Sequence, residues 1–328
     1  MLRELVNGYR TTQAIRVAAQ FGIADLLTAG SRTSDYLAAA TGTDPAALYR
    51  LLRALAAAGV FREEEGKRFA LTPVGDCLRR DAPESIYGWA MFVGGTDQWQ
   101  LWSSLDHSIR TGENARRHVF GTDGWTYRQQ HPDLGTEFDL AMSSIANLVI
   151  ATLLPIFDFG RFSTIVDVGG GNGSLLAAIL ARYPAMCGVL FDQPHVVAGA
   201  GAVLARAGVA DRCDIVAGDF FREIPKCGDA WILKSIVHDW EDEESIAILG
   251  NCRKAIAVGK ALLVVERVLG PPNEEPDSKF SDLNMLLGPG GRERSNEEYA
   301  RLFEATGFEF VGVARGASGF GIFEGIAR

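Results

Sequence analysis

The sequence comprises 328 residues, of which 47% are hydrophobic and 22% are charged, the composition of a soluble globular protein with about two domains. Its net charge of −9 argues against nucleic acid as the main partner. The N-terminus shows no signal-peptide pattern, and the longest apolar stretch, residues 148–155, is too short to span a membrane. We therefore expect a cytoplasmic protein that contacts neither membrane nor nucleic acid.

Five cysteines are spread along the chain, at Cys77, Cys187, Cys213, Cys227 and Cys252. They show neither the paired spacing of a metal site nor a nearby histidine pattern. We expect free, mostly buried thiols in a reducing compartment, and no structural metal.

Residues 1 to about 84 are predicted to form helices followed by a hairpin. The sequence Thr-Asp-Pro at 43–45 predicts a helix start with proline in the first turn. The apolar face of this helix carries Leu48, Leu51, Leu52 and Leu55. Residues 60–62 and 68–71 flank a charged turn that contains a glycine, which is typical of a hairpin. Three helices and a hairpin make up a winged-helix arrangement.

Winged-helix modules often bind DNA, but the charge of this one favours another role. Residues 1–80 hold 11 Lys and Arg against 8 Asp and Glu, a surplus of only 3 positive charges. The expected recognition helix, 46–58, offers only Arg50 and Arg53 to a phosphate backbone. A dimerisation module is the better interpretation, because the N-terminal helix carries an apolar face with no obvious local partner.

The rest of the chain changes character near residue 158. Residues 85–157 are predicted to be helical and are rich in Trp, Met and Phe, whereas 158–328 alternate strands and helices. Such alternation predicts an α/β domain with a mostly parallel sheet. We therefore expect three segments: a dimerisation domain at 1–84, a helical connector that contributes to a substrate pocket at 85–157, and a ligand-binding catalytic domain at 158–328.

Residues 167–173, Asp-Val-Gly-Gly-Gly-Asn-Gly, lie between a β-branched apolar run and a helix-like run. A glycine turn in this position presents bare backbone to a nucleotide-like ligand. A dinucleotide fingerprint would need its third glycine at Ser174, and the Gly-Lys-Ser/Thr ending of a phosphate loop is absent. The spacing resembles the first motif of S-adenosylmethionine-dependent methyltransferases, with Asp167 facing the cationic end of the ligand. An ordinary glycine turn is the alternative.

Acidic residues follow the next two predicted strands. Asp192 lies about 20 residues beyond the glycine loop, where a carboxylate can bind ribose hydroxyls; a helix-capping role before Pro194 is the alternative. Residues 215–221 end a strand with Gly-Asp-Phe-Phe, which can offer a carboxylate to an adenine amino group and an aromatic face to its ring. A common Gly-Asp turn is the alternative there. Ligands of such sheets bind at the carboxyl ends of the strands.

Three further ionisable residues are predicted near the same sheet edge. His238 follows the strand at 230–234, and a histidine there titrates near neutrality and can take a proton; a structural histidine or helix cap is the alternative. Glu266 ends the strand at 261–265. Glu293 lies in a glycine turn at 290–294, where a solvated turn charge is the simpler interpretation.

Together these motifs resemble the caffeic acid-type O-methyltransferases, specifically their bacterial natural-product branch. The segments 167–171, 218–221, 238–240 and 290–294 occur in order at family-like spacings, and 21–27, 50–55 and 71–75 resemble the winged-helix dimerisation domain of that family. The resemblance covers nearly the whole chain. It implies a class I, Rossmann-like domain with a mostly parallel seven-stranded sheet, a homodimer, S-adenosylmethionine (SAM) as donor, S-adenosylhomocysteine as product, and no metal.

The resemblance also implies roles for individual residues. The implied SAM-binding residues are Asp167, Gly169, Gly171, Gly173, Asp192, Gly218, Asp219, Phe220 and Lys234. His238 is the implied general base, with Glu266 and Glu293 orienting its ring. Plant members often carry Met where this chain has Phe220, and the turn before Gly290 looks slightly shortened, which bears on the wall of the substrate pocket.

The resemblance implies SN2 methyl transfer to a hydroxylated aromatic molecule of secondary metabolism, such as an antibiotic precursor. A flat aromatic acceptor also suits the dense set of candidate wall residues: Trp89, Met91, Phe92, Trp99, Trp102, Phe138, Met142, Met285 and Leu286. By position in the family, the expected acceptor contacts are Met142, Asn147, Asp239 and Met285. Core packing is the alternative for each wall residue.

Three other functions stay open from the sequence. One is N- or C-methylation of an aromatic heterocycle on the same frame. A second is a SAM-binding relative that does not transfer the methyl group, of the decarboxylase or hydroxylase type, although the intact set of His238, Glu266 and Glu293 argues against it. A third, of a different class, is a winged-helix regulator that senses a ligand, which the acidic net charge disfavours.

Overall fold

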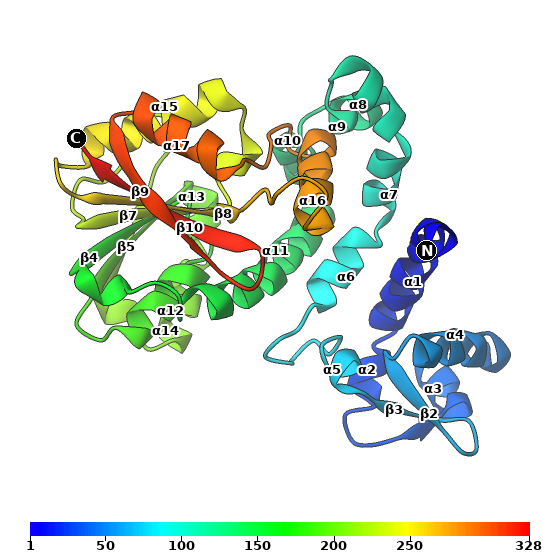
Figure 1. The fold of residues 1–328 in the computed structure, drawn as a ribbon. Helices are drawn as coiled ribbons and strands as arrows, with labels where there is room; N and C mark the ends of the chain where they lie inside the picture. Colours follow the sequence, from blue (N-terminus) through cyan, green and yellow to red (C-terminus); the bar gives the residue numbers. More distant parts are fainter. The chain divides into compact units, whose positions relative to one another are not determined.

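The computed structural model describes all 328 residues, which divide into two compact units (Figure 1). The N-terminal unit comprises residues 1–104 and 125–145, and the sheet unit comprises residues 105–124 and 146–328. The division at 84 and 157 that we expect from the sequence stays a prediction.

The N-terminal unit begins with the helices and the hairpin that the sequence predicts. Its first elements are α1 (Leu2–Gln20), α2 (Ile23–Leu26), β1 (Arg32–Thr33), α3 (Ser34–Thr41), α4 (Pro45–Ala57), β2 (Phe61–Glu64) and β3 (Arg68–Leu71). The strands form a sheet in the order β1-β3-β2. Helix α4 starts where predicted, because the Asp44 side chain accepts a hydrogen bond from the backbone of Ala47. Leu48, Leu52 and Leu55 of this helix are buried in the core of the unit.

Residues 85–157 are mainly helical, as predicted. Following α5 (Pro73–Asp76), the helices are α6 (Tyr87–Val93), α7 (Thr96–Ser103), α8 (Leu105–Thr111), α9 (Ala115–Phe120), α10 (Gly124–Gln130) and α11 (Pro132–Leu153). The short pair α8 and α9 belongs to the sheet unit and packs there against α16 (Pro276–Leu287).

The sheet unit is built on seven strands in the order β6-β5-β4-β7-β8-β10-β9. The strands are β4 (Thr164–Val168), β5 (Cys187–Asp192), β6 (Cys213–Ala217), β7 (Ala230–Lys234), β8 (Ala261–Arg267), β9 (Phe308–Arg315) and β10 (Phe320–Ala327). The first five are parallel, whereas β10 runs antiparallel to both β8 and β9. The predicted mostly parallel, seven-stranded sheet is therefore confirmed. Its first strand, β4, lies centrally between β5 and β7, where the strand order reverses.

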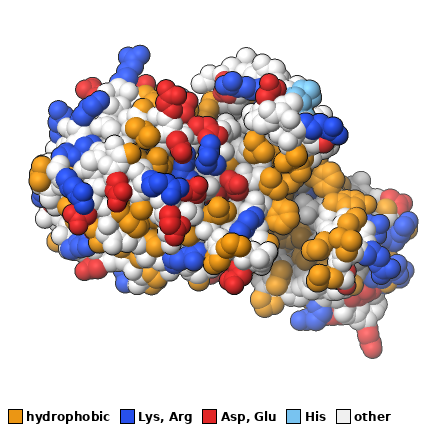
Figure 2. All heavy atoms as spheres, turned by 45° about the horizontal axis from the view of Figure 1, so that its top comes forward, with side chains coloured by type: hydrophobic (Ala, Val, Ile, Leu, Met, Phe, Trp, Pro, Cys, Tyr) orange, Lys and Arg blue, Asp and Glu red, His pale blue; other side chains and the backbone are white.

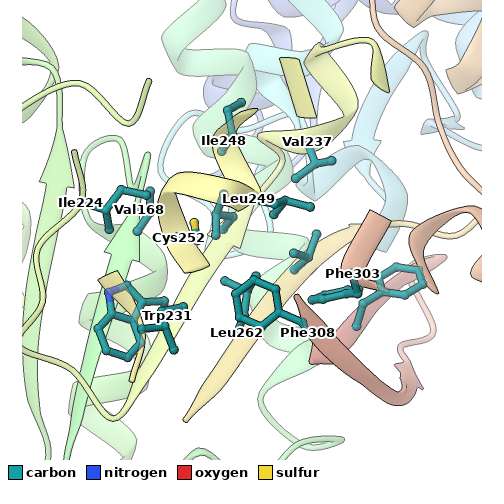
Figure 3. Packing of buried hydrophobic residues seen from close by; sticks show 14 of the residues in the cluster. Val168, Ile224, Trp231, Val237, Ile248, Leu249, Cys252, Leu262, Phe303 and Phe308 are labelled. Carbon is teal, nitrogen blue, oxygen red and sulfur yellow. The ribbon is translucent and has the colours of Figure 1, made fainter. Parts of the chain in front are cut away.

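Helices cover both faces of this sheet (Figure 1). On one face lie α15 (Asp242–Ala255) and α17 (Asn296–Ala305), and on the other lie α12 (Ser174–Arg182) and α14 (Ala200–Arg206). Figure 3 shows the core beneath α15 and α17, in which Leu249 and Phe303 pack over strand residues such as Trp231 and Leu262. This core fixes the strands whose ends carry the candidate site.

The cysteines are free, as predicted, but the expectation that they are mostly buried is wrong. Cys252 in α15 is buried, whereas Cys187 and Cys227 are exposed and the other two are half-buried. Cys187 occupies the first position of β5, and Cys227 lies in the loop before β7, so neither reaches the packed part of the sheet.

Charged and hydrophobic side chains are distributed differently over the surface. Positive and negative side chains are interspersed on the face in Figure 2, whereas hydrophobic side chains gather over the N-terminal unit. None of the helices is both long enough and apolar enough to cross a bilayer.

Candidate active site

The glycine loop after β4 has a backbone that only glycine adopts readily. Gly169, Gly171 and Gly173 have φ angles of +69°, +62° and +80°. A Cβ on Gly169 would lie 2.5 Å from the Ile236 side chain, so this loop also packs closely against the segment after β7. The loop thus lies at the carboxyl end of the central strand, where ligands of such sheets bind.

Asp167, in β4 just before the loop, is a buried carboxylate without a protein partner. It is 1% exposed, and neither of its oxygens accepts a hydrogen bond. Burial raises the pKa of Asp167 to about 7, although the nearby charge of Lys234 opposes the rise. Burial in turn lowers the pKa of Lys234. Since an unpaired buried carboxylate is costly, this position suits a cationic group of a ligand.

Asp192, at the end of β5, is hydrogen-bonded to the backbone of the glycine loop. One of its oxygens accepts a hydrogen bond from the backbone of Gly171 at 2.8 Å, and the other accepts from the backbone of Gln193 at 2.7 Å. Burial raises the pKa of Asp192, and these backbone hydrogen bonds oppose the rise. Gln193, not Asp192, occupies the N-cap position of the short helix α13 (Pro194–Val197), and no side chain caps this helix, so the alternative role of Asp192 as helix cap is not realised.

The segment after β6 carries Gly218, Asp219 and Phe220. A Cβ on Gly218 would lie 2.3 Å from the Phe191 ring, which requires glycine there. The segment is held by Asn251 of α15, whose side-chain amide donates to the backbone oxygens of Phe220 (3.0 Å) and of the following residue (2.8 Å). Sequence reasoning missed Asn251, because a polar residue in a helix gives no local sign of its partner on a loop.

Glu266 shapes the turn that carries His238. The turn follows β7 through Ser235, whose φ of +55° is unusual for a residue with a side chain, and continues as the 3-10 helix η3 (Val237–Asp239). One carboxylate oxygen of the fully buried Glu266 accepts hydrogen bonds from the backbone of Ile236 (2.9 Å) and Val237 (2.8 Å). Glu266 therefore binds the turn backbone as well as facing the imidazole.

The imidazole of His238 lies among three carboxylates. Its Nδ1 is 3.3 Å from Glu293 Oε1 and 3.6 Å from Glu266 Oε2, while its Nε2 is 3.6 Å from Asp239 Oδ1. The His238 side chain keeps 13% of its surface exposed, whereas those of Glu266 and Glu293 keep 0% and 1%. The structure thus brings together the three residues that we expect to act on a proton, with Asp239 beside them.

The charge of these carboxylates determines how His238 titrates. Burial by itself lowers the pKa of His238, but the charges of Glu266, Asp239 and Glu293 and the hydrogen bond that the ring donates to Glu293 raise it to about 10. The expectation of titration near neutrality is therefore wrong for the protein alone. Burial raises the pKa of Glu266 to about 7, whereas the pKa of Glu293 is lowered, since contact with His238 outweighs its burial.

Glu293 is buried, so its interpretation as a solvated turn charge is wrong. Its turn packs directly onto the His238 turn: a Cβ on Gly291 would lie 2.1 Å from the His238 carbonyl oxygen. Arg294, 1% exposed, locks the two turns together by donating to the carbonyls of Val237 (3.0 Å) and Trp240 (2.8 Å). Arg294 has no role in the sequence-based prediction, because its partners lie more than 50 residues away.

The expected acceptor contacts fall in both units. Met142 belongs to the N-terminal unit, whereas Asn147, Asp239 and Met285 belong to the sheet unit. Met142 and Asn147 are exposed on α11, and Met285 is 8% exposed on α16. Among the aromatic wall candidates, the Phe92 ring packs against Phe138 (5.6 Å between centroids) and is tilted against Trp89 (6.0 Å). These rings pack in part on one another, as core residues do.

Two family models match the chain, and together they cover most of it. An O-methyltransferase domain matches residues 102–309, and an O-methyltransferase dimerisation domain matches residues 3–81.

Individual proteins are similar over nearly the whole length. The phenazine O-methyltransferase PhzM of Lysobacter antibioticus is 42% identical, with 99% of this chain and 95% of the relative covered. An 8-amino-8-demethylriboflavin N,N-dimethyltransferase of Streptomyces davaonensis is 38% identical, with 90% of this chain and 86% of the relative covered.

Solved structures show the same fold. The crystal structure of LaPhzM superimposes with a TM-score of 0.93 at 41% identity, covering 100% of this chain and 98% of the other. The O-methyltransferase NcsB1 from neocarzinostatin biosynthesis, solved with SAM and 2-hydroxy-5-methyl naphthoic acid, superimposes with a TM-score of 0.79 at 32% identity, covering 97% and 96%. The seven-stranded sheet is thus that of a class I SAM-dependent methyltransferase.

Proposed function

This chain belongs to the family of SAM-dependent O-methyltransferases, and we propose that it methylates a phenolic hydroxyl of an aromatic natural product with His238 as the general base. One observation carries the assignment of the base. An imidazole stands at the carboxyl edge of the sheet with Nδ1 against two buried glutamates and Nε2 directed away from them.

The strand ends of the sheet unit suit SAM, which when bound supplies an electrophilic methyl group on a sulfonium centre. The proposed contacts are backbone groups of Gly169, Gly171, Gly173 and Gly218 and side chains of Asp167, Asp192, Asp219, Phe220 and Lys234. The unpartnered oxygens of Asp167 support this proposal, because a ligand ammonium group would satisfy them. Asp192 can bind ribose hydroxyls, and the segment with Asp219 and Phe220 can face adenine.

Phenol ionisation is the barrier that His238 would lower. A phenol titrates near pH 10, so forming the phenolate at pH 7 costs about 4 kcal/mol. The carboxylates behind His238 stabilise the imidazolium that forms when Nε2 of the neutral ring takes the acceptor proton. His238 loses its own proton more readily once a cation binds at the neighbouring strand ends, because like charges oppose each other.

The acceptor is proposed from the compounds named for the relatives and from the acceptor contacts expected from the sequence. PhzM is named for a phenazine and NcsB1 was solved with a hydroxylated naphthoic acid, both planar aromatic compounds. The 3.6 Å between Asp239 Oδ1 and Nε2 of His238 supports Asp239 as a proposed acceptor contact. Met142, Asn147 and Met285 are proposed as further contacts. We propose a role in secondary metabolism of the antibiotic type.

N-methylation is the second candidate, because one relative is named an N,N-dimethyltransferase. A neutral aromatic amine needs no general base before it attacks a methyl group, so the carboxylate-backed His238 favours the hydroxyl. A screen of hydroxylated aromatics against their amino analogues, with product masses determined, distinguishes the two. Methylation of the amines alone would refute the O-methylation proposal.

A homodimer is proposed from the dimerisation-domain match and from the apolar face of α1. Leu2, Leu5, Val6 and Tyr9 recur at helical spacing and are 74%, 71%, 65% and 50% exposed. A second copy of the chain would remove this surface from water. Light scattering is expected to give twice the 35.4 kDa chain mass, and a monomer at micromolar concentration would contradict the proposal.

The base assignment is tested by His238→Ala. Turnover is expected to fall by roughly 10²- to 10⁴-fold, the typical contribution of a general base. The dissociation constant of SAM, measured by calorimetry, is expected to stay near the wild-type value. An equal loss of SAM affinity and turnover would argue that His238 supports the fold of the site instead of acting on the acceptor proton.

A further inference from the structure

Helix α16 holds Glu293 at two points. The Ser281 hydroxyl donates to Glu293 Oε1 at 2.7 Å, and the Glu293 backbone N–H donates to Asp282 Oδ1 at 2.9 Å. Glu293 Oε1 is also the oxygen that lies 3.3 Å from His238 Nδ1. One carboxylate oxygen therefore lies between a hydroxyl donor from α16 and the imidazole.

Two glutamates compete for Nδ1 of His238, but they are held differently. Glu266 is fixed by the backbone N–H groups that its Oε1 accepts, and its Oε2 stays 3.6 Å from the ring. Glu293 has no such backbone anchor for its carboxylate, although its Oε2, like that of Glu266, is buried without a hydrogen-bond partner. The position of the Glu293 carboxylate therefore depends on Ser281 and on the imidazole itself.

The helix that presents Ser281 is anchored within the sheet unit. The side-chain amide of Asn114, between α8 and α9, donates to the carbonyl oxygens of Leu286 and Gly288 at the end of α16, each at 3.0 Å. The oxygen of the same amide accepts from the backbone of Arg116, at the start of α9. These contacts fix α16 at the end beyond Ser281, so the hydroxyl is presented from a rigid support.

We propose that Ser281 is a positioning residue for methyl transfer, whose hydroxyl holds the carboxylate of Glu293 against Nδ1 of His238 as the nearest counter-charge of the imidazolium. The proposal rests on the proposed role of His238 as base. Ser281 acts through Glu293 and not on the acceptor.

Hydrogen-bond chemistry gives the direction of the effect. A hydroxyl that donates to a carboxylate favours its ionised form, so Ser281 helps to keep the pKa of Glu293 low. Without the hydroxyl, the carboxylate is both less ionised and less fixed, and the imidazolium of His238 loses its nearest counter-charge. The other ionisable groups that act on this pair are Glu266, Asp239, Asp282, Arg267 and Tyr299. The Ser281 hydroxyl donates to Glu293 and to none of these groups.

The test compares three variants of the full chain. Ser281→Ala removes the hydroxyl, Ser281→Thr restores one, and Ser278→Ala removes the hydroxyl of another serine of α16, which bonds only backbone groups of residues 270 and 275. Two quantities are measured: kcat at saturating SAM and acceptor, and the pKa of the His238 imidazole by NMR, assigned by comparison with His238→Ala.

Ser281→Ala is expected to lower kcat about tenfold and the pKa of His238 by about one unit, because a hydrogen bond to a charged group is lost. Ser281→Thr is expected to recover most of the kcat and most of the pKa of His238. Ser278→Ala is expected to keep the wild-type titration of His238. The proposal is overturned if Ser281→Ala titrates as wild type, or if Ser278→Ala produces the same shift. Wild-type turnover of His238→Ala would instead refute the base assignment and leave the titration result standing.

Discussion

Two halves of the candidate site are built in opposite ways. The donor half, defined as the carboxyl ends of β4, β5 and β6, presents glycine backbone and the carboxylates of Asp167 and Asp192. The proton half, defined as η3, Glu266 and the turn at 290–294, is a set of buried charges that bind one another. In the donor half Asp167 has no hydrogen-bond partner, whereas in the proton half Glu266 and Glu293 each have one oxygen bonded by the protein.

Because of this difference, the donor half depends on its ligand for stability, whereas the proton half depends on its own paired charges. A site with an unpartnered buried carboxylate is costly until its ligand arrives, so we expect ligand binding to stabilise the donor half. A site of mutually paired charges is stable as it stands, but the removal of one member leaves the others uncompensated. Substitutions in the two halves should therefore change the free energy of unfolding by different amounts and in opposite directions.

Arg294→Met is expected to give the largest effect, in the proton half. The variant leaves the carbonyls of Val237 and Trp240 without their buried donor, which should lower the free energy of unfolding by roughly 2–6 kcal/mol, about 1–3 kcal/mol for each unsatisfied carbonyl. Arg292→Met is a matched control, since Arg292 is 46% exposed and pairs only with Glu241 at the surface, an interaction of about 1 kcal/mol or less. Urea unfolding measures both. Equal losses would show that Arg294 does not lock the two turns.

In the ligand-free protein, Asp167→Asn in the donor half should raise the free energy of unfolding, the opposite of the effect of Arg294→Met. The pKa of Asp167 is raised from about 3.8 to about 7 in the folded protein, so the folded state binds more protons than the unfolded state between these values. Stability of the wild type therefore falls as pH rises from about 4 to about 7, and then levels off as far as this group is concerned. The amide carries no charge and avoids this loss.

We expect Asp167→Asn to be more stable than the wild type at pH 8, by up to about 4 kcal/mol, and the gain to shrink toward pH 4. Urea unfolding at both pH values measures the difference. The unchanged Glu266 and His238 cancel from it, whereas the buried Lys234 loses the charge of Asp167, which reduces the gain. The variant should bind SAM more weakly, because it lacks the charge for a cationic group. A variant that is less stable than the wild type at both pH values would contradict an unpartnered, ligand-facing Asp167.

The contrast between the halves also explains what the sequence could predict. The donor half depends on residues next to strand ends, so the glycine loop, Asp192 and Asp219 could be placed from strand and turn patterns alone. The proton half depends on contacts across 28 to 57 residues, such as Glu266 with the His238 backbone and Arg294 with Val237. Residue type and spacing carry no record of such contacts, and a charged glycine turn normally faces solvent.

The titration of His238 shows the same limit. Its residue type predicts a value near neutrality, and only the folded arrangement places three carboxylates around it. Ser281 and Asn251 likewise occupy unremarkable helical positions, and their partners become evident only when the helices are packed on the sheet. The cap of α4 at Asp44 was predictable for the opposite reason, since its partner is three residues away.

Asp192→Ala is expected to give the smallest of the three effects and separates the halves most cleanly. The variant loses a carboxylate proposed for ribose and the hydrogen bond to the Gly171 backbone, so SAM affinity should fall about tenfold, which corresponds to roughly 1.4 kcal/mol. The proton half is untouched, so kcat at saturating SAM should stay near wild type. His238→Ala should show the reverse pattern, with affinity kept and turnover lost. Calorimetry and saturation kinetics on the two variants test the separation.

Asp192→Asn keeps one acceptor oxygen for the loop, so its SAM affinity should lie between those of Asp192→Ala and wild type. Wild-type SAM affinity in Asp192→Ala would remove Asp192 from the donor half altogether.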